Sequence, residues 1–222
     1  MITVEINNKG YKLPTGFTVA QWQEMMLWDF ENPKHWPRIF EIALGVPQEE
    51  ISGEVTDGEV VAMSFIIAQM SARVHYEIPD FNELKFGQFV DLDVYVNLGI
   101  DKNLQNMLDV LELPIEMAPQ ALTVIEQFVL WRTSVYRQYK SLFGLHDKDF
   151  EEWADDQEPQ DPMATARGWY RIIVELAGDN ILNMDAVTEE PLKKVLNFMA
   201  LQKEKKLAEA EAIRKQRKQA AL

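Results

Sequence analysis

The first residues of the chain alternate between apolar and polar side chains around a turn that contains asparagine and glycine. This pattern is typical of a β-hairpin. Thr18 follows, with a glutamine three positions later, and this capping-box spacing predicts the start of a helix. A second alternating run at residues 73–78 favours a further strand. Residues 1–80 are therefore expected to form a small α+β region of the ubiquitin-like, β-grasp type. The apolar residues of its first strand are Ile2, Val4 and Ile6.

Beyond this region, apolar residues recur three and four positions apart, which predicts helices. Thr56 and the glutamate three positions later repeat the capping-box spacing. Glycines and prolines mark the ends of the helices. We expect a helical region at residues 81–145, an acidic loop at 146–161, and C-terminal helices at 162–222 that include an extended charged helix. The fold class is α+β, predominantly α, and no internal repeat is expected.

The character of the chain changes near its end. Residues 202–218 are nearly all strong helix formers without glycine or proline, yet they carry few apolar side chains. A helix with so little to bury generally needs a partner or frays. In the segment that begins near Glu189, four residues are expected to be buried and two to anchor a partner. These candidate partner-binding residues are Leu192, Val195, Leu196 and Met199, followed by Leu207 and Ile213.

Composition limits the classes of function. The chain has 222 residues, of which 47% are hydrophobic, and no cysteine, which excludes disulfides, a thiol nucleophile and cysteine metal sites. It has no signal-peptide pattern and no apolar stretch of the roughly 20 residues that a membrane-spanning helix needs. We therefore expect a soluble protein that is made in a cytoplasm and does not bind membranes.

The net charge of −14 is distributed unevenly along the chain. From Glu189 onward there are nine basic and five acidic residues, a net charge of +4, which leaves −18 on the rest. An acidic body repels the phosphates of nucleic acid. A basic tail on an acidic body favours docking on a neighbouring copy, although a solvated helical tail accounts for the same composition.

The acidic loop offers one candidate metal site. If Asp147 is position 1 of an EF-hand loop, Asp149, Glu151 and Glu158 fall at positions 3, 5 and 12, where calcium ligands are expected. Position 6, which must be glycine for the sharp turn, is Glu152. A solvated acidic loop is therefore the better interpretation.

Other catalytic and metal-binding patterns are missing from the sequence. The three histidines, His35, His75 and His146, are too far apart to form a sequence motif. Asp91 and Asp93 are two positions apart, so on a helix they would point about 200° apart and would not share a metal. We expect a charge near the helix N-terminus for one of them and solvent exposure for the other. No phosphate-binding loop or serine-nucleophile motif is present. We assign no catalytic, cofactor-binding or metal-binding residue.

One predicted helix alternates aromatic with basic residues, a composition that suits single-stranded nucleic acid. The alternative is a core stripe whose basic side chains extend outward to solvent, and this alternative is favoured. The aromatic and basic residues are Trp131, Arg132, Tyr136, Arg137, Tyr139 and Lys140. The apolar residues that would complete the core stripe are Val129, Leu130, Val135 and Leu142.

Three segments resemble proteins of tailed bacteriophages. The sequence LKFGQFVDLDVY at residues 84–95 is similar to a short element that opens a helix in baseplate-hub, tail-assembly and virion proteins. A hairpin followed by TVAQWQEM at residues 18–25 has a similar order, and EPLKKVLNFM at 190–199, before a charged helix, is similar to segments of proteins from large contractile-tailed phages. The resemblance includes no catalytic motif, so it implies no site residue.

The resemblance implies a non-enzymatic structural or assembly protein of the phage tail or baseplate, located in the virion or in the host cytoplasm during assembly. Its partners would be other tail or baseplate proteins or copies of itself. A transient tail assembly chaperone or adaptor for a tape-measure-like protein is one alternative. A nucleic-acid-binding module is another. No cofactor is expected.

Overall fold

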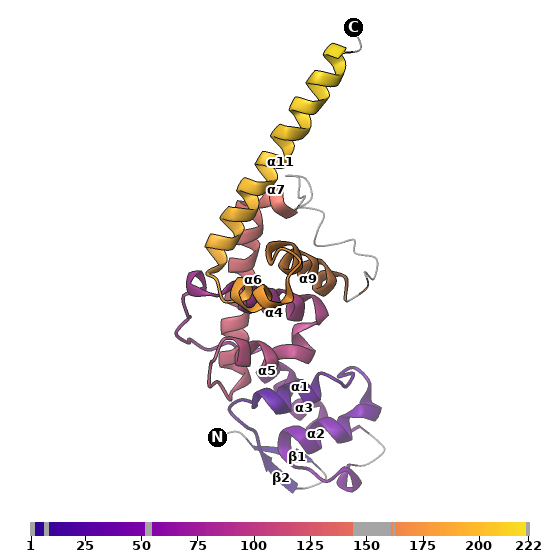
Figure 1. Ribbon diagram of the computed structural model, residues 1–222. Helices are drawn as coiled ribbons and strands as arrows, with labels where there is room; N and C mark the ends of the chain where they lie inside the picture. The colour runs from indigo at the N-terminus through magenta and orange to yellow at the C-terminus, as the bar shows by residue number, and fades with distance from the viewer. Residues whose placement is uncertain (1–2, 7–8, 52–54, 144–160, 162, 221–222) are drawn as a thin grey trace. The chain divides into compact units, whose positions relative to one another are not determined.

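The computed structural model describes residues 3–6, 9–51, 55–143, 161 and 163–220 (Figure 1). It confirms an α+β fold that is predominantly α-helical, with an N-terminal hairpin and a long C-terminal helix. The chain forms two compact units. Unit 1 comprises Met1–Pro79 and Gly99–Gln127, and unit 2 comprises Asp80–Leu98 and Phe128–Leu222. The expected helical region 81–145 is thus divided between the units, because helical periodicity does not reveal which neighbours a helix packs against. The expected acidic loop, 146–161, lies outside the described residues except for Asp161.

Unit 1 begins with an antiparallel hairpin in which Val4 lies opposite Tyr11. Val4 and Ile6 are buried, while Thr3 and Glu5 face solvent, as the alternation predicted. Helix α3 packs against strand β1, and α1 packs against both α2 and α5. The elements of unit 1 are β1 (Thr3–Ile6), β2 (Lys9–Lys12), α1 (Val19–Met25), η1 (Pro33–His35), α2 (Trp36–Leu44), η2 (Gln48–Glu50), α3 (Asp57–Met70), α5 (Ile100–Val110) and the first part of α6 (Ala118–Gln138).

The strand expected at residues 73–78 is not formed, and the sheet within the described residues has two strands. Side chains of α6 hold this segment instead. The Thr123 hydroxyl donates to the Val74 carbonyl at 2.9 Å, and Arg73 forms an ion pair with Glu126 at 3.2 Å. The segment is thus fixed without the backbone pairing that a β-grasp sheet requires.

Unit 2 is built around α4, which packs against α9, α10 and α11. Its core is rich in aromatic rings in edge-to-face contact, a favourable geometry for ring pairs. Phe89, for example, contacts Trp131 and Trp169 with ring centroids 6.0 and 5.9 Å apart. The elements of unit 2 are η3 (Phe81–Glu83), α4 (Phe86–Leu98), α6 from Phe128 onward, α7 (Lys140–Phe143), α9 (Ala164–Leu176), η4 (Ile181–Asn183), α10 (Met184–Thr188) and α11 (Leu192–Ala220).

The same backbone motif, which we call the helix-start bridge, occurs once in each unit. In it, the residues before two helices pair as an isolated antiparallel bridge, Thr18 with Met117 in unit 1 and Lys85 with Pro191 in unit 2. Two backbone hydrogen bonds flank each bridge. In unit 1, Val19 N donates to Glu116 O (2.8 Å) and Ala118 N to Phe17 O (2.9 Å); in unit 2, Phe86 N donates to Glu190 O (2.8 Å) and Leu192 N to Leu84 O (3.0 Å).

The two helix-start bridges make α1 the counterpart of α4, and α6 the counterpart of α11. A glutamine has the same role in both: Gln21 Oε1 accepts from the Thr18 amide and Gln88 Oε1 from the Lys85 amide, each at 3.1 Å. The two units thus share a local motif, although we found no internal repeat in the sequence. The motif is formed mainly by backbone groups, so it needs few identical residues.

Candidate functional site

The start of α11 belongs to the core of unit 2. Leu192, Val195 and Leu196 are buried, and Met199 is partly buried, so these four predicted residues stabilise the chain's own fold. The Tyr139 hydroxyl donates to Asn197 Oδ1 at 2.8 Å and adds a polar tie between α11 and the end of α6. Leu192, Val195 and Leu196 position the helix and do not form a free surface for a partner, whereas Met199 stays partly exposed.

The rest of α11 is exposed. From residue 204 to residue 216 every side chain is solvent-exposed, including Leu207 at 58% and Ile213 at 51%. Successive helical residues are about 100° apart. By this spacing Leu207, Ala210 and Ile213 lie within the same arc of about 120° that carries Leu192 and Leu196 lower on the helix. The arc, which also carries Lys206 and Arg214, therefore continues past the core of unit 2, where no described helix or strand of that unit lies beside it in Figure 1.

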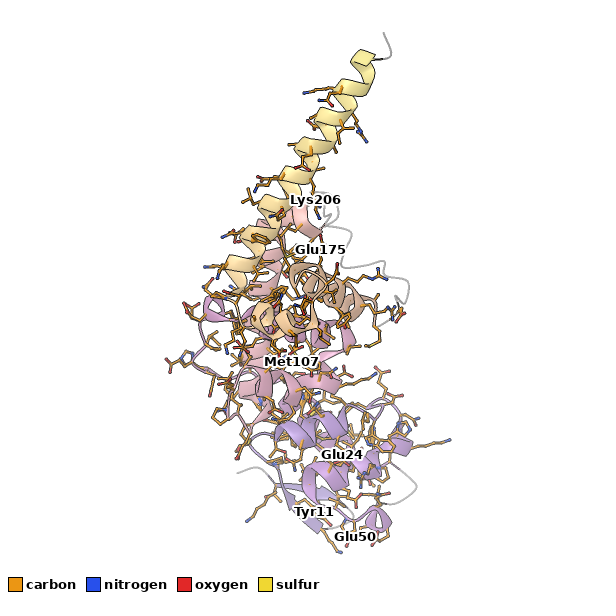
Figure 2. All side chains as sticks on the ribbon, in the orientation of Figure 1. Tyr11, Glu24, Glu50, Met107, Glu175 and Lys206 are labelled. Atoms are coloured by element: carbon orange, nitrogen blue, oxygen red, sulfur yellow. The ribbon has the colours of Figure 1, made fainter. Side chains whose placement is uncertain are left out.

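A groove of about 470 Å³ lies where α11 leaves the core, beside α7 and α9. Its rim is polar. Lys206 Nζ forms an ion pair with Glu175 Oε1 at 2.6 Å, two residues that Figure 2 labels side by side, and Lys203 donates to the Ser141 carbonyl. Both partners of the ion pair are largely exposed, so it contributes little to stability. The apolar lining of the groove consists of Leu142, Ile172, Leu176, Phe198 and Met199.

The exposed part of α11 is basic, whereas unit 1 is strongly acidic. Helix α11 carries nine lysines and arginines against three glutamates, a net charge of +6. The residues of unit 1 include six lysines and arginines against sixteen aspartates and glutamates, a net charge of −10. Opposite charges on two surfaces attract one another and speed their encounter, most strongly at low salt.

The most buried polar cluster of unit 2 centres on Asp93, which is 0% exposed. Its Oδ1 accepts from Arg132 Nε at 2.5 Å and from the Tyr136 hydroxyl at 2.6 Å, and its Oδ2 accepts from Trp169 Nε1 at 2.7 Å. We had expected one of Asp91 and Asp93 to lie near the helix N-terminus and the other in solvent. Asp91 is exposed, but the expectation is wrong for Asp93, because it meets a cation and two further donors in the core.

This cluster acts as a structural tie. Burial raises the pKa of Tyr136, so its hydroxyl stays protonated and keeps donating to Asp93. Arg132 balances the carboxylate charge, and all four side chains are less than a tenth exposed. Neither the groove beside α11 nor the cavity of about 380 Å³ beside Trp131 is lined by Asp93. The cluster thus joins α4, α6 and α9 and gives no substrate access to its carboxylate.

The aromatic and basic stripe of α6 is largely core. Tyr136 and Tyr139 are buried and unavailable for stacking on bases. Two details of the favoured interpretation are wrong. Arg132 turns inward to Asp93 instead of outward, and Leu130, expected in the core, is 62% exposed. The two buried tyrosines and the internally paired Arg132 are thus unavailable to nucleic acid, whereas Trp131 is partly exposed.

The histidines are dispersed. His35 Nδ1 accepts from the Asp29 amide at 3.2 Å, and its ring packs edge-on against Trp28 with centroids 5.5 Å apart. His75 is exposed, and His146, like the EF-hand register that starts at Asp147, lies outside the described residues. Within the described residues, no three histidine, aspartate or glutamate side chains converge closely enough to hold a metal ion.

No family model, no curated protein and no solved structure matches this chain. Among the helices of the described residues, none combines the length and the apolar character needed to cross a bilayer. The site must therefore be interpreted from its own geometry. Its distinctive feature is a long helix whose first two turns lie in a core and whose later turns present apolar and basic side chains to solvent.

Proposed function

We propose that this protein is a non-enzymatic assembly protein that binds its partner through the exposed part of α11. In line with the resemblance of residues 84–95 and 190–199, we propose a role in the tail or baseplate of a tailed bacteriophage. One observation carries the proposal. The apolar face of α11 continues beyond the core of unit 2 and exposes Leu207 and Ile213 there.

The energetics favour a partner that covers more than these two side chains. Complete burial of a leucine or isoleucine contributes about 1.5–3 kcal/mol, and both residues are already half buried. Together they supply about 2–3 kcal/mol, which is less than the cost of association. Contacts with the basic residues of α11, or several such interfaces acting together, must supply the rest. A protein that works in an ordered assembly meets this requirement through multivalency.

The test compares two double variants of the full chain. Leu207→Glu with Ile213→Glu places charge on the exposed face of α11. The matched control is Ile181→Glu with Leu182→Glu. It makes the same change at two residues of unit 2 that are more exposed than Leu207 and Ile213. Both variants should keep the wild-type circular dichroism. In affinity purification from phage-producing cells, a partner retained by the wild type and by the control should be lost from the α11 variant.

A partner that the α11 variant retains at wild-type levels would refute this role for the helix. Deletion from Gln202 onward provides a second form of the test. It removes the exposed turns and the surface contacts of Lys203 and Lys206, but leaves Leu192, Val195 and Leu196 in the core. The truncated protein should fold and fail to assemble. If it enters particles normally, the proposal fails.

The groove beside α11 supports a second candidate, a transient tail assembly chaperone. Its volume of about 470 Å³ and its half-exposed Phe198 suit an apolar segment of a client such as a tape-measure-like protein. Mass spectrometry of purified virions separates the two candidates. A structural component is present at constant copy number, whereas a chaperone is absent from the mature particle.

A further inference from the structure

We infer that the exposed part of α11 binds the outer face of α3 in a second copy of this chain, so that copies associate head to tail. This inference rests on the proposed function and names its partner. Three observations support it: a second unpartnered apolar face, a large difference in charge between the two surfaces, and a precedent within the chain for a helix shared between units.

The second apolar face lies on α3 in unit 1. The inner side of this helix, which includes Met63 and Ile66, is buried, and yet the outer side is also apolar. Val61 is 59% exposed, and Val60 and Ile67 are nearly half exposed. The one hydroxyl among them, on Ser64, donates to the Val60 carbonyl at 2.8 Å and so leaves the face less polar. A helix that is apolar on all sides generally buries its outer side against a partner.

The two faces match in length. Val60 to Ile67 spans about 10 Å of helix axis, and Leu207 to Ile213 spans about 9 Å, at 1.5 Å per residue. The α3 face carries no charged residue from Val60 to Ile67, whereas the α11 face has Lys206 and Arg214 directly beside its apolar positions. Two such helices can pack with their side chains interdigitated, at an axis separation of roughly 8–10 Å.

The charges select this pairing over association of like faces. Two α11 helices, each with a net charge of +6, repel one another, as do two copies of unit 1 at −10. Pairing α11 with unit 1 brings opposite charges together. Acidic residues are available close to the outer face of α3, where Asp57 occupies the first turn of the helix. Such complementarity sets the partner and the rate of encounter more than it sets the affinity.

Helix α6 provides the precedent. It starts at the helix-start bridge of unit 1, and from Phe128 onward its residues belong to unit 2. Helix α11 starts at the equivalent bridge of unit 2 and likewise continues beyond it. Helix α6 thus begins in one unit and ends among the residues of the other. We infer the same arrangement for α11, except that the unit against which its later turns pack belongs to the next copy.

This geometry determines the type of assembly. The two surfaces differ, so the interface is heterologous and each copy keeps one free surface of each kind, which produces chains or rings. A single helix–helix contact is at the small end of specific interfaces, so we expect dissociation on the order of micromolar or weaker. Association should therefore depend on concentration and on salt.

The test uses light scattering coupled to size-exclusion chromatography on the full chain, whose mass is 25.7 kDa. At about 100 μM and low salt the wild type should exceed the mass of a dimer, and dilution or about 0.5 M salt should return it to a monomer. Two variants each remove one surface: Val61→Arg with Ile67→Arg on α3, and Leu207→Glu with Ile213→Glu on α11. Each should be monomeric alone, with wild-type circular dichroism.

Mixing the two variants supplies the decisive result. Each retains the surface that the other lacks, so an equimolar mixture should form a dimer and nothing larger. The Ile181→Glu, Leu182→Glu control should assemble like the wild type. If the wild type is monomeric at every concentration, the inference is overturned. The proposed function would then still be tested by the affinity purification, which does not depend on self-association. Assembly lost only in the α11 variant places the contact on another surface and overturns the α3 assignment.

Discussion

The buried Asp93 cluster allows a sharp prediction about stability. The carboxylate of Asp93 accepts three hydrogen bonds, two at Oδ1 from Arg132 and Tyr136, and one at Oδ2 from Trp169. Replacing it with asparagine keeps the shape but turns one acceptor into an NH₂ donor. Whichever way the amide is oriented, it faces at least one donor of the cluster, and the buried Arg132 loses its counter-charge.

The magnitude follows from the burial. Removing one partner of a buried ion pair costs about 3–5 kcal/mol, because the remaining charge stays buried and unpaired. A folded protein is stable by about 5–15 kcal/mol in total, so Asp93→Asn should remove about a fifth or more of the stability. Urea unfolding followed by far-ultraviolet circular dichroism measures this as a lower midpoint at an unchanged slope.

Asp91 is the matched control because it lies on the same helix but is exposed. Desolvation of its carboxylate by neighbouring protein atoms raises its pKa, so loss of its charge should be neutral or slightly favourable. We expect Asp91→Asn to change the free energy of unfolding by less than about 0.5 kcal/mol. If the free energy of unfolding of Asp93→Asn lies within about 1 kcal/mol of the wild-type value, then the cluster is not the tie that we describe.

Two further predictions concern the same unit. A Cβ on Gly87 would lie 2.9 Å from the Cβ of Thr188, so Gly87→Ala should destabilise unit 2 by about 1–3 kcal/mol. A Cβ on Gly168 would meet no atom within 4 Å, so Gly168→Ala should stabilise helix α9 by about 0.5–1 kcal/mol. The urea midpoint of each variant measures its effect. Because the pKa of Tyr136 is raised on folding, its contribution to stability is complete below pH about 10 and is lost as the pH rises further. The urea midpoint of the wild type should therefore fall above pH about 10, and it should fall less in Tyr136→Phe.

Local rules predicted the local parts of this fold. The alternation of residues 2–6 gave the hairpin, and the capping-box spacings at Thr18 and Thr56 are both confirmed by their hydrogen bonds. The high helix propensity of residues 202–218 predicted a helix that leaves the core, and residues 204–216 are exposed. These features depend on residues a few positions apart, which a sequence displays directly.

Features that depend on distant residues escaped sequence reasoning. The alternation at residues 73–78 resembles a strand, but contacts from Thr123 and Glu126 fix that segment without a sheet. Spacing excluded a shared metal at Asp91 and Asp93 but did not show which of the two was buried. No signal in the sequence distinguishes them, because both lie in the same run of mostly apolar residues.

The helix-start bridges also determine how the chain must fold during synthesis. Each bridge joins segments about one hundred residues apart, Thr18 with Met117 and Lys85 with Pro191, and the two loops overlap along the sequence. The first bridge cannot close until residue 117 has been synthesised. By then Lys85 of the second bridge has also been made, but its bridge partner Pro191 has not. Contacts of such high sequence separation slow folding. An N-terminal fragment can therefore complete unit 1 only once Gln127 has been made, and unit 2 cannot close its bridge at Lys85 until Pro191 and the final helix have been made.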